Sequence, residues 1–143
     1  QCLMGRTYTQ GYETNPIYWL LEKMPRTVTN ADAPWAIWYP LRRTGAFALL
    51  KPEEQRKILM EHGMIGRSFA AAGYAADVRL ASYGLDRQDN DFMIGLIGSD
   101  LHPLSAVVQR MRSTVQTSEY IAGLGPFFVG RVVWQSKVEA DVE

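Results

Sequence analysis

The chain has 143 residues, of which 47% are hydrophobic, enough for one soluble globular domain or for part of a larger protein. The net charge of +0 gives no overall field that attracts nucleic acid or an anionic membrane, and no apolar run approaches the roughly 20 residues of a membrane span. The single cysteine, Cys2, excludes an internal disulfide and a cysteine-based metal site within one chain. We therefore expect a cytoplasmic protein without a nucleic-acid partner.

The chain divides into three parts by pattern. Residues 1–33 show little periodicity beyond a short predicted helix over 17–23, and we interpret them as a linker and the remnant of a preceding domain. Residues 34–136 hold the regular elements, and residues 137–143 form a charged tail. The start of the chain lacks the pattern of a signal peptide, so we expect a chain that begins partway through a protein.

Six elements are predicted after residue 34. In chain order they are a strand over 35–40 ended by proline, a helix over 52–73, strands over 78–83 and 92–97, a helix opening at 99–100 and a strand over 127–134. Loops are expected over 42–45 and over 114–125, the second with room for a short helix. A tight polar turn joins the second and third strands, and helices form the longer connections. This order predicts a ferredoxin-like α+β fold, an antiparallel sheet with helices on one face, which hosts many activities and names no function.

One histidine is placed where a core residue is expected. In the predicted helix Ile58, His62, Ile65 and Phe69 fall on a single stripe. The ordinary interpretation is a core histidine bonded to a carbonyl. A metal site made of protein ligands alone is poorly supported, because the second histidine, His102, begins another helix. Haem is the remaining alternative, since it needs one axial imidazole, an apolar slot, and basic or hydroxyl groups for its propionates.

Several segments in chain order resemble one family. They are residues 12–16 followed by Met24 and Pro25, the run WYPLRRTG over 38–45, residues 52–56 leading into EHGMIGRSF over 61–69, residues 84–86 with 91–92, Met111 with Arg112, and PFFVG over 126–130. Together they resemble the chlorite dismutase superfamily, and within it the coproheme decarboxylases of Gram-positive haem synthesis. The resemblance implies two ferredoxin-like domains in tandem with haem in the second, of which this chain would be the second domain and the preceding link. It also implies a homo-oligomer, often a pentamer.

The resemblance implies roles for four residues. His62 would be the axial iron ligand, and burial would favour the neutral imidazole that this needs. Tyr39 would be oxidised to a radical that starts the loss of propionate carboxylates, although it also fits a plain edge-strand aromatic. Arg112 and Thr117 would hold a propionate through a guanidinium and a hydroxyl, although Arg112 is equally an ordinary surface arginine.

Two positions stay open within the resemblance. The basic position after the Tyr-Pro segment falls on Arg43 or Arg42, which would hold another propionate. The distal polar position falls on Asp77, where chlorite dismutases have arginine and many decarboxylases glutamine. Arg79 lies two residues along the same predicted strand, faces the same way and would substitute in another register.

Three functions follow as hypotheses. In the first, coproheme is substrate and cofactor, hydrogen peroxide is the oxidant, and haem b is the product of a step in haem biosynthesis. The second is chlorite decomposition, which needs a distal cation that only Arg79 offers. The third is a haem-binding or purely structural relative without the chemistry.

Overall fold

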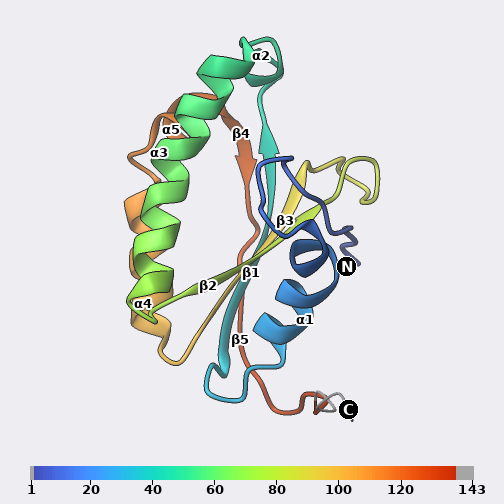
Figure 1. Ribbon diagram of the computed structural model, residues 1–143, viewed down its shortest axis with the longest axis vertical. Helices are drawn as coiled ribbons and strands as arrows, with labels where there is room; N and C mark the ends of the chain where they lie inside the picture. The colour runs from blue at the N-terminus through green and yellow to red at the C-terminus, as the bar shows by residue number, and fades with distance from the viewer. Residues whose placement is uncertain (1, 138–143) are drawn as a thin grey trace.

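The fold is an antiparallel sheet of five strands, seen in a computed structural model that describes residues 2–137 (Figure 1). The strands are β1 (Trp35–Arg43), β2 (Ala76–Ala81), β3 (Phe92–Gly98), β4 (Ile121–Leu124) and β5 (Phe128–Arg131). The helices are η1 (Tyr18–Glu22, a π-helix), α1 (Lys23–Val28), α2 (Gly45–Ala48), α3 (Pro52–Ala71), α4 (Leu101–Met111) and α5 (Val115–Tyr120). The strand order β2-β3-β1-β4 is ferredoxin-like, so the predicted fold class is confirmed.

Helices lie on both faces of the sheet. In Figure 1, α3 and α4 lie on one side of the strands and α1 on the other. The helices α3 and α4 were predicted; the helix formed by η1 and α1 adds a cover on the second face that the residues of 1–33 did not reveal. The predicted short helix over 17–23 is therefore present but extends to Val28.

The central strand β1 runs past its proline. Pro40 was expected to end the strand, but β1 continues to Arg43, so the predicted loop at Arg42 and Arg43 is wrong. Proline is tolerated here because β5 pairs with residues 35–38 and β4 with residues 41–43, which leaves the missing N–H of Pro40 between the two neighbours. This extension places Arg43 on the sheet.

Each face of the sheet has its own apolar core. Met24, Ala36, Val78 and Ile97 are buried between α1 and the sheet. Beneath α4, the buried cluster consists of Ile37, Ala75, Leu96, Leu104 and Val107. Trp38 lies so close over Gly95 that a Cβ there would stand 2.5 Å from its ring, which explains a glycine inside β3.

The C-terminal part of the chain differs from the sequence prediction. The loop or short helix expected over 114–125 is α5 followed by β4, and the last strand is shorter than predicted. Residues 138–143 of the expected charged tail lie outside the described residues. Within residues 2–137, every helix falls short of the length or the apolar character required to cross a bilayer.

Candidate functional site

The helix α3 carries His62 along one side of the sheet. Its N-terminus has Pro52 in the first turn, and the Glu54 carboxylate accepts a hydrogen bond from the Lys51 N–H at 3.1 Å, as the sequence pattern indicates. Ile65 and Phe69 pack against the core under α4, so the stripe that contains His62 faces the sheet. No side chain of this 20-residue helix is fully buried, which is unusual for a helix that lies over a sheet.

The imidazole of His62 is neutral and free to act as a ligand. The pKa of His62 is lowered to about 4, mainly by burial and also by the positive charges of Arg43 and Arg79, which act against the carboxylates of Asp77 and Glu61. Its Nδ1 is buried and has no hydrogen-bond partner among the described residues. The structure therefore does not show the bond to a carbonyl that an ordinary core histidine would make.

The strands place several of the predicted side chains on the face that α3 covers. Residues directly opposite in an antiparallel pair share a face, and Tyr39 lies opposite Ile94, which lies opposite Arg79. By the same rule Asp77 and Leu96, which lie opposite each other, are on this face as well. Asp77 and Arg79 thus point to the same side of β2, toward the helix that carries His62.

Tyr39 packs against another aromatic ring on this face. Its ring stacks on Phe127 with a centroid distance of 4.5 Å and an interplanar angle of 26°. Burial raises the pKa of Tyr39 well above the ordinary value of a phenol, and the negative charge of Asp77 adds to this. The hydroxyl consequently keeps its proton across the range in which enzymes work, so Tyr39 can react only by giving up a proton together with an electron or by donating a hydrogen bond.

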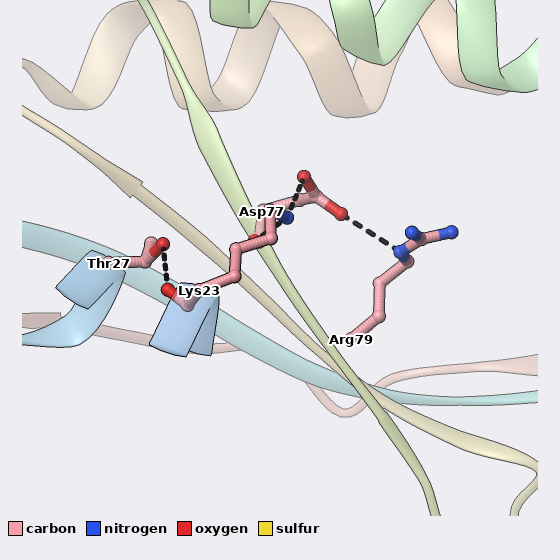
Figure 2. Close-up of polar contacts among 4 residues, drawn as sticks. All are labelled: Lys23, Thr27, Asp77 and Arg79. Atoms are coloured by element: carbon pink, nitrogen blue, oxygen red, sulfur yellow. Dashed lines mark hydrogen bonds and ion pairs between the residues drawn. The ribbon is translucent and has the colours of Figure 1, made fainter. Parts of the chain in front are cut away.

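Asp77 is bound by two cations (Figure 2). Lys23 Nζ donates to both the carbonyl oxygen and Oδ1 of Asp77 at 2.9 Å, and Arg79 Nε lies 3.0 Å from Oδ2. Burial alone would raise the pKa of Asp77, but the charges of Lys23 and Arg79 and the hydrogen bond from Lys23 outweigh it and hold the pKa below the usual value. The carboxylate is therefore ionised, and Lys23 and Arg79 balance its negative charge.

Of the two adjacent arginines, Arg43 is the one turned inward. Its Nε and Nη2 donate to Oε1 of the buried Gln116 at 3.2 and 2.9 Å, and its guanidinium lies over the rings of Phe47 and Phe92 at 4.6 and 4.8 Å. Arg42 is exposed and donates to the carbonyl of Gln88. A guanidinium has five N–H donors, so Arg43 retains free donors in this arrangement.

The remaining two predicted residues lie apart from these side chains. Arg112 is exposed at the C-terminal end of α4. Thr117 lies half-buried on α5, with its hydroxyl 3.2 Å from that of Thr114. No hydrogen bond or ion pair within residues 2–137 joins Arg112 or Thr117 to the other predicted residues. The structure thus brings His62, Tyr39, Arg43, Asp77 and Arg79 together under α3. Thr117 follows Gln116, the partner of Arg43, but has no bond of its own to this group among the described residues.

Three residues beside this group were not predicted. Lys23 and Gln116 hold Asp77 and Arg43, and the ring of Tyr8 packs against Phe92 with centroids 5.7 Å apart. Burial raises the pKa of Tyr8, and the charges of Arg43, Arg79 and Asp77 act on it. Tyr8 reaches this place because Arg6 pairs with Ala81 at the edge of β2. A single bridge of this kind leaves no periodic pattern in the sequence.

The donor set suits a metal that brings its own ring of ligands. Among the described residues no group of three histidine, cysteine, aspartate or glutamate side chains could hold a metal ion. His62 fits haem instead, as one neutral imidazole beside apolar, basic and phenolic side chains. A hollow on the described surface lies beside His62, lined by its neighbours Glu61 and Ile65 on α3 and by Thr114 at the start of α5.

Comparison with known proteins gives matches through most of the chain. Residues 8–133 match the sequence model of the chlorite dismutase family. A coproheme decarboxylase of Staphylococcus carnosus is 31% identical over 106 residues, which make up 71% of this chain and 41% of that protein.

Solved structures support the same assignment. A haem-binding protein from Thermus thermophilus has a TM-score of 0.62 and 26% identity, over 70% of this chain and 40% of its own. Chlorite dismutase from Candidatus Nitrospira defluvii in complex with imidazole has a TM-score of 0.62 at 20% identity, over 68% and 40% of the two chains, a likeness that shows the fold. The chain spans less than half the length of these relatives. The resemblance noted in the sequence is confirmed: the chain belongs to the chlorite dismutase family.

Proposed function

We propose that this chain is the haem-binding part of a protein that decarboxylates coproheme with hydrogen peroxide and yields haem b. The observation that carries the proposal is His62, a neutral imidazole whose buried Nδ1 has no partner among the described residues, on a helix that covers the sheet face of Tyr39 and Arg79. The relative from Staphylococcus carnosus, a coproheme decarboxylase, supports this choice of substrate.

His62 and the strand residues would contact opposite sides of a ligand that lies between α3 and the sheet. His62 would bind the iron, because its pKa of about 4 leaves the imidazole unprotonated at neutral pH. A ligand held by His62 between α3 and the sheet would present its other side to Tyr39, Asp77 and Arg79. The haem iron, when bound, supplies the site where peroxide is reduced.

Tyr39 would start the loss of carboxylate from the substrate. Its raised pKa keeps the phenol protonated, so it can release one proton and one electron together to the oxidising centre. The stack on Phe127 fixes the ring, which limits the reaction to a substrate side chain bound next to it. Each propionate would lose carbon dioxide, a proton and two electrons and become a vinyl group, while hydrogen peroxide would accept the two electrons, that proton and one proton from solvent and become two water molecules.

The propionates would be held by cations and a hydroxyl. Arg43 keeps donors free beside its bonds to Gln116 and would bind one carboxylate from within the site. Arg112 and Thr117 are proposed for another propionate. Because Arg112 is exposed at the end of α4, it would reach a carboxylate at the rim of the site and in contact with water.

The test is stepwise decarboxylation. The chain is mixed with ferric coproheme, hydrogen peroxide is titrated, and the porphyrin is followed by mass spectrometry. Loss of two carboxyl groups in sequence is expected. Tyr39→Phe should bind coproheme with the native affinity and release no carbon dioxide, whereas Tyr74→Phe, a change at an exposed tyrosine, should behave as the native chain. Turnover by Tyr39→Phe would remove Tyr39 from the mechanism.

Chlorite decomposition is the second candidate, favoured by one observation. Arg79 provides a cation on the sheet face that the helix of His62 covers, and the charge of Asp77 is offset by Lys23 and Arg79, so it does not leave the site negative. Oxygen release from chlorite by the haem-loaded chain, measured with an oxygen electrode, would establish this activity. Haem binding without either turnover would identify an inactive haem-binding relative.

We also propose that the domain over 34–136 works as part of a larger assembly. The chain covers 41% of the length of the coproheme decarboxylase relative, and every residue of β5 is exposed on this chain. An exposed strand edge readily pairs with another chain. Light scattering of the purified chain should therefore give a mass above that of one copy, and the expectation of a homo-oligomer fails if the mass is that of a monomer at all concentrations.

A further inference from the structure

The ion pairs around Arg79 join the two faces of the sheet. Lys23 belongs to α1, which covers the face opposite α3, and it reaches around β2, the edge strand, to Asp77 (Figure 2). The Lys23 side chain is only 15% exposed, although its amino group is charged. A nearly buried lysine with two hydrogen bonds to one residue indicates a structural constraint and not a solvated surface pair.

The hydrogen bonds from Lys23 fix the orientation of the Asp77 carboxylate. Because Lys23 bonds to both the main-chain oxygen and Oδ1 of Asp77 at 2.9 Å, the carboxylate cannot rotate freely, and Oδ2 is left directed at Arg79. Trp19 completes the arrangement, since its ring lies 4.6 Å from Lys23 Nζ and 5.4 Å from Arg79 Cζ. Two cations and one carboxylate leave one net positive charge at this place.

Arg79 is paired with Asp77 but still has an unused hydrogen-bond donor. Its Nε lies 3.0 Å from Asp77 Oδ2, but the N–H does not point at that oxygen, and the buried Nε has no hydrogen-bond partner among the described residues. A buried donor without an acceptor is rare in folded proteins and favours any acceptor that can reach it. Arg79 faces the same side as Tyr39, where a ligand bound by His62 would expose its free coordination position.

We propose that Lys23 and Asp77 are positioning residues that hold the guanidinium of Arg79 toward the open side of the bound haem, so that the site prefers a small anionic ligand or one that accepts a hydrogen bond. The proposal rests on the proposed haem site at His62. Lys23 acts through Asp77, and Asp77 acts through Arg79. A residue of the helix on the far face thereby determines the ligand preference on the near face.

The test compares an anion with a neutral ligand on the ferric haem-loaded chain. Fluoride and imidazole are titrated and followed by absorption. Arg79→Gln should weaken fluoride binding about 10-fold or more, the value of one hydrogen bond to a charged group, and Lys23→Met should weaken it several-fold. Imidazole affinity should change less than about twofold in both, because a neutral ligand does not need the cation. The control is Arg26→Met, which removes a charge from an exposed part of α1.

Asp77→Asn separates positioning from simple charge. If Asp77 only repelled anions, its neutralisation would strengthen fluoride binding; if it holds Arg79, fluoride binding weakens, as we expect. The double variant Lys23→Met with Arg79→Gln should match Arg79→Gln alone within about twofold, since Lys23 has nothing left to position. Additive losses, or stronger fluoride binding by Asp77→Asn, would overturn the proposal.

A second measurement needs no haem. In the apo chain the Nε–H of Arg79 should give a distinct, slowly exchanging arginine signal in a ¹⁵N-edited NMR spectrum, and Lys23→Met should move it to the position of a free arginine while Arg26→Met leaves it in place. An unchanged signal in Lys23→Met overturns the positioning role. Failure of the chain to bind haem, with the NMR result as expected, would refute the haem site and with it the ligand preference. Only the positioning of Arg79 by Lys23 and Asp77 would then stand.

Discussion

The face of the sheet under α1 and the face under α3 contain different kinds of side chain. Under α1 the contacts are apolar and closed, with Met24, Ala36, Val78 and Ile97 all buried. Under α3 the strands carry Tyr39, Arg43, Asp77 and Arg79, and α3 itself has no fully buried residue. The same sheet thus supports one face that is filled by apolar side chains and one that combines the apolar cluster under α4 with charged and phenolic groups under α3.

This difference shows where the fold obtains its stability. Burial of apolar area contributes about 25 cal/mol per Å², so the closed face and the cluster under α4 hold the domain together. The residues around His62 contribute less, because charged groups are costly to bury without partners. Charged and phenolic groups can occupy the α3 face because the other contacts already stabilise the sheet.

The largest effect is expected from the closed face. Ile97→Ala removes a side chain that is 5% exposed and should lower the free energy of unfolding by about 2–5 kcal/mol, whereas Ile65→Ala on the α3 side should lower it by less than about 2 kcal/mol. Urea unfolding followed by circular dichroism measures both. Equal losses would mean that the two faces are packed alike.

Loss of the imidazole should remove haem binding without comparable loss of stability. His62→Ala should weaken haem affinity more than about 100-fold, since even partners of a metal ligand cost about 10- to 100-fold. Haem titration by absorption gives the affinity, and the histidine-ligated spectrum should disappear. The matched control is His102→Ala, a change at an exposed histidine on α4, which should leave the haem affinity and the spectrum unchanged. An intact spectrum in His62→Ala would exclude it as the ligand.

The depressed pKa of His62 predicts how the apo chain responds to acid. The unfolded histidine, with a pKa near 6.5, takes up a proton before the folded one, whose pKa is about 4. The stabilising effect is therefore complete above pH 6.5 and is lost as the pH falls from 6.5 to 4, by up to about 3 kcal/mol. Unfolding of the native chain and of His62→Gln across this range should differ by that amount. Parallel pH profiles would show that His62 titrates normally.

The smallest effect concerns a helix cap on the α3 side. Asp100 accepts a hydrogen bond from the His102 N–H at 3.1 Å and caps α4. Asp100→Ala should lower the free energy of unfolding by about 1 kcal/mol and leave haem affinity unchanged, because the cap supports the helix and not the ligand. Thermal unfolding measures the loss of stability, and haem titration measures the affinity. A changed haem affinity would extend the site to the start of α4.

Much of the fold was predictable from local pattern. The helix α3 follows from Pro52, the glutamates after it and the stripe through His62, and the cap at Asp100 marks α4. The short strand β4 and the passage of β1 beyond Pro40 were not predictable, since both depend on how two strands share one neighbour. A proline is tolerated in a strand only where the partner at its N–H side is missing, and that is a property of the assembled sheet.

The main helices α3 and α4, the order of the predicted elements, the family and the candidate residues under α3 were predictable from the sequence, because these depend on periodicity and on segments that can be compared along the chain. The tertiary structure alone decided that Lys23 reaches Asp77 around the edge of the sheet, that Arg43 binds Gln116, and that Tyr8 packs against Phe92. Each of these contacts joins residues far apart in the sequence, and the charge of one group there depends on neighbours that no local pattern reveals.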